Sequence, residues 1–261
     1  MRLAFFDRYL KNRQTGVDDW PAISYFTMGA ERLDYTESWP PPGATSRTFY
    51  LQGGGVLSET PPPDAAASDT YTVDFTTTTG MSNRWMTQMG NPVLNLNDRA
   101  AMDRRMLHYD TPPMTQDLQV TGTPVVTMWV DSDHTDGALL VYLEDVSEDG
   151  VSRYITEGGL RLIHRNTSVN PHFDQSAPYH SFARKDAAPL VPGEVVALTF
   201  QLWPTSVLIR RGHRLRLAIA GADADTFDRI PATGTPTIRV HRSAARLSSI
   251  DIPVVPSPRN E

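Results

Sequence analysis

Two short segments of the sequence place a serine two positions after a glycine, an arrangement in which the serine could act as a nucleophile. They are Gly80–Arg84, which reads GMSNR, and Gly150–Tyr154, which reads GVSRY. An α/β-hydrolase holds its nucleophile in G-x-S-x-G, because small residues permit the strained strand-to-helix turn. Both segments lack the final glycine, and neither precedes a convincing helix. We therefore predict no catalytic serine in either, and the second segment fits a hairpin turn better.

The histidines offer no clear base or metal site. None of the seven is spaced as H-x-x-x-H or H-E-x-x-H, the patterns of a helix-borne zinc site. His180, within Pro178–Ser181, is the strongest candidate for a catalytic base, yet a structural role is the expected one. The seven are His108, His134, His164, His172, His180, His213 and His241.

Clustered carboxylates occur in two places. Asp131, Asp133 and Asp136 fall within seven residues, and clustered aspartates are how loops bind calcium. Counting from Asp131, however, an EF-hand would need glutamate where Tyr142 stands. A polar turn is the expected structure here and also at Asp223 and Asp225. We predict no metal ligand and no cofactor-binding residue.

Charge and aromatic residues bear on the partners. Arg210, Arg211, Arg214 and Arg216 form a basic cluster, but the net charge of −6 argues against nucleic-acid binding. The last two alternate with leucines, so they are expected on one solvated strand face. Trp85, Trp129 and Trp203 could supply surfaces on which a ligand stacks, although Trp129 is expected in the core.

The pattern of the chain predicts an all-β protein. Leu3–Lys11 has apolar residues at helical spacing, whereas most later segments are short strands separated by glycine and proline. Asn83–Asp103 is expected to be a long loop with a short helix near Asp98–Met106, and Pro253–Glu261 to fray. The predicted fold is an antiparallel jelly roll or β-sandwich, galactose-binding-like, with one short N-terminal helix. The expected strands include Ile23–Met28, Thr48–Leu51, Val125–Val130, Leu139–Glu144, Tyr154–Leu162, Val207–Ile209 and alternating residues around Tyr71, Leu198, Leu217 and Ile238.

The sequence says little about the cellular compartment of the protein. The chain has no cysteine, which excludes disulfides and thiolate ligands. No run approaches the roughly 20 apolar residues that a membrane-spanning helix needs. We see no signal peptide, so a cytoplasmic location is the default expectation, with no membrane partner.

Several segments, taken in order, resemble the CocE/NonD family of X-Pro dipeptidyl-peptidase-like serine hydrolases. Each segment alone is a weak signal, but the ordered set covers nearly the whole chain and matches the C-terminal third of the family. The segments are Phe5–Lys11, Tyr25–Ala30, Tyr50–Gly55, Val120–Pro124, Tyr142–Val146, Thr156–Gly158, Pro178–Phe182, Leu190–Glu194 and Ile219–Asp223.

The resemblance implies a domain layout. Residues 1–30 would be the end of an α/β-hydrolase domain, residues 31–255 a C-terminal jelly roll and residues 256–261 a tail. Family members cleave esters or amides with a Ser-Asp-His triad that lies upstream of the segment matching Phe5–Lys11. The resemblance therefore implies that this chain carries no catalytic residue and is inactive alone.

The same layout implies a partner. An α/β-hydrolase domain would cover the apolar face of the N-terminal helix, and the jelly roll would shape one side of the active-site cleft. Two alternatives stay open: a stand-alone carbohydrate- or ligand-binding module, and the non-catalytic subunit of a split hydrolase. A homo-oligomer is a further assembly left open.

Overall fold

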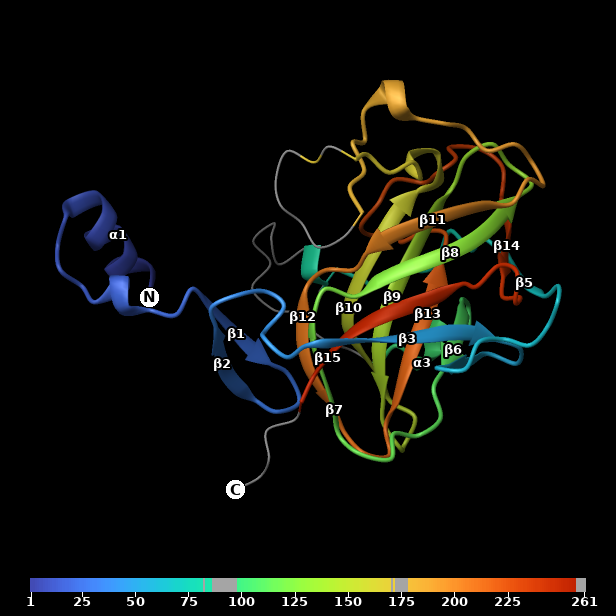
Figure 1. Cartoon of the computed structure of the whole chain (residues 1–261). Coiled ribbons are helices and arrows are strands. Elements are labelled where there is room, and N and C mark those ends of the chain that lie inside the picture. The colour runs from blue at the N-terminus through green and yellow to red at the C-terminus, as the bar shows by residue number, and fades with distance from the viewer. Residues whose placement is uncertain (82, 86–97, 170, 172–177, 257–261) are drawn as a thin grey trace.

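The computed structural model describes all residues of the chain except 82, 86–97, 170, 172–177 and 257–261 (Figure 1). Within the described residues, no helix is both long and apolar enough to cross a bilayer. The described chain is a β-sandwich with a helix standing apart at its N-terminus, which confirms the predicted fold class.

Helix α1 (Arg2–Lys11) ends at Asn12, whose left-handed backbone caps it (φ 51°). A Lys11–Asp7 ion pair of 2.6 Å, one turn apart, supports it on the exposed side. None of its residues is buried, and Figure 1 shows it well away from the sandwich. The helix predicted at Leu3–Lys11 is therefore confirmed, but within this chain its apolar face has no core to enter.

Fifteen strands follow in the described part of the chain, with short helical turns between some of them. The helical turns are η1 (Val17–Asp19), α3 (Ala100–Asp103), η2 (Leu162–His164) and η3 (Arg184–Asp186). The strands are β1 (Ile23–Thr27), β2 (Arg32–Thr36), β3 (Thr45–Gln52), β4 (Val56–Ser58), β5 (Ser68–Thr72), β6 (Leu107–Asp110), β7 (Leu118–Gly122), β8 (Val125–Ser132), β9 (Ala138–Val146), β10 (Ser152–Arg161), β11 (Val196–Gln201), β12 (Thr205–Ile209), β13 (Arg214–Ala220), β14 (Thr237–His241) and β15 (Ser249–Val255).

Two layers of strands face each other across the core. One layer runs β10-β9-β13-β6, and β4 links it to the second, which runs β3-β15-β8-β14-β5. Strand β11 adds to β8, β7 pairs with β15, and β12 pairs with β7. All these pairs are antiparallel except a single parallel bridge between β4 and β6. The long-range pairing makes the fold non-local along the chain, as is usual for sandwiches.

Strand β13 illustrates how the sequence fills two environments. Leu215, Leu217 and Ile219 point into the main core between the layers. Ala218 and Ala220, on the opposite face, belong to a smaller apolar cluster with Met106 and Tyr142. Because successive side chains alternate between faces, one strand contributes to both. The second cluster lies on the outer face of the β10-β9-β13-β6 layer, below the segment that contains α3.

The structure corrects one expectation and extends the predicted strand set. Strand β15 continues through Pro253 to Val255, where fraying was predicted, because this stretch pairs with β3 and β7. Strands β2, β4, β6, β7 and β15 were not among those expected. Strands β1 and β2 form a hairpin whose register joins Thr27 to Arg32 across the domain boundary predicted after residue 30.

Candidate functional site

A cavity of about 620 Å³ opens beside β10, the strand at the edge of its layer. Its floor comes from Gly158–Arg161 of β10 and from Leu140 of β9, and a wall comes from Pro178–Phe182. Residues 200–203 and the turn after β13 close the remaining sides. The volume and the mostly apolar lining fall in the range of small-molecule sites.

Three aromatic rings gather at this cavity. The indole of Trp85 meets Trp203 edge-to-face, with ring centroids 5.6 Å apart, and meets Phe227 in the same way at 5.5 Å. Trp203 is 44% exposed and Phe227 is 42% exposed, so large apolar surface faces solvent. Exposed aromatic surface beside a cavity is typical of a binding or docking region.

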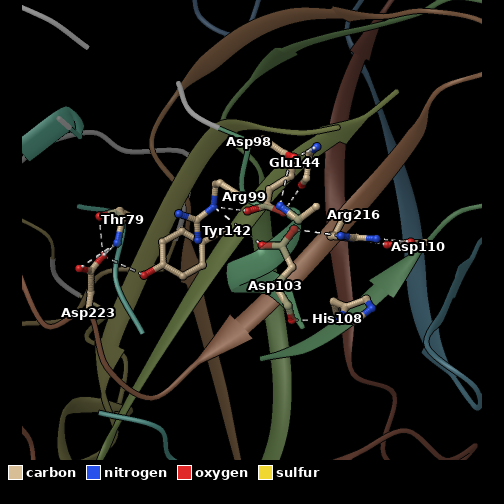
Figure 2. A network of polar contacts seen from close by, with 12 residues as sticks. Thr79, Asp98, Arg99, Asp103, His108, Asp110, Tyr142, Glu144, Arg216 and Asp223 are labelled. Carbon is tan, nitrogen blue, oxygen red and sulfur yellow. Dashed lines mark hydrogen bonds and ion pairs between the residues drawn. The ribbon is translucent and has the colours of Figure 1, made fainter. Parts of the chain in front are cut away.

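The segment that carries Trp85 is held by the buried carboxylate of Asp223. This carboxylate accepts hydrogen bonds from the Thr79 hydroxyl (2.6 Å) and amide (3.2 Å) and from the Tyr142 hydroxyl (3.2 Å), as Figure 2 shows. Asn83 adds a 2.7 Å bond to Thr226. Residues 77–81 and Asn83 are thereby fixed to the turn after β13, and Trp85 lies two positions beyond Asn83.

A wider polar network covers the outer face of the same layer. The Arg99 guanidinium lies over the Tyr142 ring at 4.7 Å and binds Glu144 (Figure 2). Burial raises the pKa of Tyr142 well above its usual value. Burial also raises the pKa of Glu157; Asp223 adds to that rise and Arg84 opposes it. These groups are buried among one another, which suits a structural network more than a solvent-facing catalytic one.

His180 is a structural residue. Its Nδ1 lies 2.8 Å from the carbonyl oxygen of His164, and its Nε2 lies 2.9 Å from that of Thr199. The ring is buried and contacts Phe182 at 5.9 Å. Because both nitrogens face backbone carbonyls, the ring ties η2 to β11, and neither nitrogen is directed at a serine.

The serines and remaining histidines have other partners. Ser152 is fully buried and donates to Glu144 at 2.9 Å, whereas Ser82 and His172 lie outside the described residues. His108 lies 3.2 Å from the Asp103 carbonyl, and His164 packs on Phe182. The other three form His–Asp pairs at 2.6–2.8 Å: His134 with Asp133, His213 with Asp145, and His241 with Asp131. That the chain has no catalytic residue stays a prediction.

The sequence pattern of the X-Pro dipeptidyl-peptidase C-terminal non-catalytic domain matches residues 15–251. The chain belongs to this family. The match confirms the resemblance that the ordered segments indicated, and it places the sandwich as the C-terminal domain of a CocE/NonD-type hydrolase.

Longer relatives of this C-terminal domain carry hydrolase names. A Mycobacterium bovis protein, provisionally named a serine esterase, is 45% identical over 255 residues, which are 97% of this chain and 40% of that protein. The cocaine esterase of Rhodococcus sp. is 26% identical over 284 residues, with 98% of this chain and 45% of the esterase covered. The chain thus spans less than half the length of these relatives.

Solved structures share the fold. An aminopeptidase from a Thaumarchaeota archaeon superimposes with a TM-score of 0.78 at 22% identity, covering 98% of this chain and 44% of the other. An α-amino acid ester hydrolase gives a TM-score of 0.77 at 24% identity, covering 96% and 44%. At these identities the likeness establishes the architecture of the C-terminal domain and nothing about its ligands.

The acidic loops of the C-terminal domain serve as anchors. Asp131 pairs with Arg239 and His241, Asp133 accepts the Thr237 amide, and Asp136 pairs with Arg161. Asp223 and Asp225 bind the hydroxyls of residues 78 and 79. Across the described ranges, no three His, Asp or Glu side chains converge as a metal site would require.

Arg216 and Trp129 differ from expectation. Arg216 lies on the predicted strand face, but it is largely buried and binds Asp110 and Asp103. Trp129 is only half-buried, because Met128 and Val130 occupy the core face of β8 and its own side chain alternates outward. The core assignment of Trp129 was therefore wrong.

Sequence reasoning missed the residues of the buried network. Arg99 and Asp103 fall in a segment that was expected to be a loop with a short helix, where polar residues are normal. The one available signal was Glu144, which ends the apolar run of β9 on the face opposite Leu143. A charged residue inside a buried strand predicts a partner, but not which one.

Proposed function

We propose that this C-terminal domain packs on a catalytic α/β-hydrolase domain and that the complete protein hydrolyses esters or amides. The observation that carries the proposal is the unpartnered face of α1, where Leu3 is 72% and Leu10 is 76% exposed. Phe5 and Phe6 are also exposed. Apolar surface of this extent on one short helix indicates an interface, and the chain spans well under half of its relatives.

The β1–β2 hairpin extends the same proposed interface. Phe26 and Leu33 are cross-strand neighbours, and both are about half exposed, as is Tyr35. In Figure 1 the hairpin lies between α1 and the sandwich. Met28 bonds to β12, so the hairpin is tied to the sandwich. We accordingly propose that the C-terminal domain begins near residue 15, after α1, and not at residue 31.

The docking test uses the part of the mycobacterial relative outside the matched region, expressed separately and mixed with this chain. Binding should be measured by isothermal titration calorimetry. Phe6→Glu should weaken it at least tenfold, because a charge would be buried at the interface. Val191→Glu, an equally exposed site on the sandwich, is the matched control. Equal affinities for the two variants would contradict docking through α1.

The activity of the chain alone is tested separately. The purified chain should not turn over phenyl acetate, because the triad of the proposed enzyme lies in the other domain. Turnover that a serine-directed phosphonate abolishes would refute this. A hydrolase reading frame directly upstream in the genome would support a split or larger enzyme, and its absence would favour an independent module.

The aromatic cavity supports a second candidate function, a ligand-binding module. Trp203 and Phe227 offer faces on which a ring could stack. Because the lining is mostly apolar, it fits an acyl or aryl group better than a sugar. A glycan array without hits would remove carbohydrate binding. Quenching of tryptophan fluorescence by phenyl esters, lost in Trp203→Ala, would support the cavity as the acyl- or leaving-group wall of the proposed cleft.

A further inference from the structure

Two fully buried acids face each other on the outer side of the β10-β9-β13-β6 layer (Figure 2). Glu144 projects from β9, and Asp103 ends α3, which lies across that face. Two carboxylates this close in a dry site cannot both ionise without strong repulsion. The groups that bond to this acid pair, Glu144 and Asp103, therefore decide how α3 is held against the sheet.

Two arginines flank the acid pair. Arg99 Nε donates to Glu144 at 2.5 Å, and Arg216 donates to Asp103 at 2.9 Å. Arg216 also makes two 2.7 Å bonds to Asp110. Arg99 with Glu144, and Arg216 with Asp103 and Asp110, are two hydrogen-bonded groups, and a 4.0 Å approach of Arg99 Nε to Asp103 Oδ1 brings them together. They hold two guanidinium groups and three carboxyl groups, of which Glu144 and Asp103 are fully buried. The set is electrically neutral only if one carboxyl carries a proton, and an uncompensated charge at a buried carboxyl is costly.

One oxygen of the pair lacks a hydrogen-bond donor. Asp103 Oδ1 is buried and has no donor among the described residues, and Arg99 Nε is 4.0 Å away. A buried acceptor without a donor destabilises the fold, and a proton shared between the two acids would satisfy it. Burial raises the pKa of Glu144 to about 7; Arg99 opposes the rise, and the Asp103 carboxyl adds to it by repulsion and by accepting a hydrogen bond.

We propose that Glu144 is protonated in the folded domain and donates to Asp103 Oδ1, so that the acid pair is a pH-sensitive fastening of residues 98–106 to the sheet. The Ser152 hydroxyl donates to Glu144 Oε2 at 2.9 Å, and Arg99 Nε donates to Oε1. Met102 and Met106 pack beside Tyr142 on the same face, and the Arg99 amide bonds to the Ser152 carbonyl at 2.9 Å. The fastening belongs to this domain alone and does not depend on a catalytic partner.

The direction of the pH effect follows from the raised pKa. A carboxyl that is protonated more readily in the folded state stabilises it below the unfolded value of 4.5, and this contribution is lost as pH rises through about 7. Other titratable groups face the pair from the surrounding elements and need controls. They are Asp98, Arg99, His108, Asp110, Tyr142, Tyr154, Glu157, Arg216, Asp223 and Arg84.

Hydrogen exchange on the full chain tests the proposal. The amides of Met102 and Asp103 bond to the Arg99 carbonyl and report on the segment. After correction for intrinsic exchange, their opening constants should rise about 70-fold between pH 5 and pH 8, as expected when the pKa of Glu144 is about 7 in the closed state and 4.5 in the open one. Glu144→Gln retains an N–H donor and no charge, so it should remove this rise.

Two variants separate the acid pair from its neighbours. Glu157→Gln removes another buried acid with a raised pKa, and His108→Gln removes the histidine that bonds to the Asp103 carbonyl. The rise at Met102 and Asp103 should persist in both. A rise that also persists in Glu144→Gln, or a Glu144 side-chain ¹³C signal of the ionised form at pH 5.5, would overturn the proposal.

Discussion

Replacing Asp223 with alanine should loosen the segment beside the aromatic cavity and destabilise the whole domain. Asp223 is 2% exposed, and its carboxylate is the acceptor for Thr79 and for the fully buried Tyr142 hydroxyl. Truncation would leave the buried Tyr142 hydroxyl and the partly buried Thr79 donors without that partner, and a buried donor left unpaired costs roughly 1–3 kcal/mol. We expect the free energy of unfolding to fall by about 3 kcal/mol.

Asp225 in the same turn provides the matched control. It is exposed, and its carboxylate accepts a hydrogen bond from the Thr78 hydroxyl at 2.6 Å. Asp225→Ala should change the free energy of unfolding by no more than about 0.5 kcal/mol. Urea denaturation followed by circular dichroism gives both values, and hydrogen exchange of residues 77–81 shows whether the loss is local. If the free energies of unfolding of the two variants differ by less than about 1 kcal/mol, Asp223 does not anchor this segment as the contacts indicate.

Two further predictions concern packing and acid stability. Gly158→Ala should lower the melting temperature by several degrees, because the new Cβ would overlap the Gln201 carbonyl. Scanning calorimetry measures the melting temperature, and an unchanged value would contradict this prediction. Burial alone would raise the pKa of Asp131, but hydrogen bonds from Arg239 and His241 lower it overall below 3.8. Its stabilising contribution is therefore present above that value and lost as pH falls further, so Asp131→Asn should flatten stability between pH 4 and 2 in acid-unfolding curves.

The local sequence was sufficient for most of the secondary structure. Alternation in β11 and β13 and the apolar runs of β8 and β9 reflect residues that must bury one or both faces of a strand. The helical spacing from Leu3 to Leu10 fixed α1 in the same way. Strand β15 was missed because local chemistry at Pro253 disfavours a strand, whereas pairing of Pro253–Val255 with β3 and β7 outweighs that preference.

The sequence by itself determined that the chain is a β-sandwich, that its strands carry a core, and that its ordered motifs match a hydrolase C-terminal domain. Only the tertiary structure decided which distant residues meet. Glu144 and Asp103 are 41 positions apart, and Trp85 and Trp203 are 118 apart, by their residue numbers. No local preference encodes such contacts, because the order of the strands in the sheet and the packing of residues 98–106 on it place these side chains together.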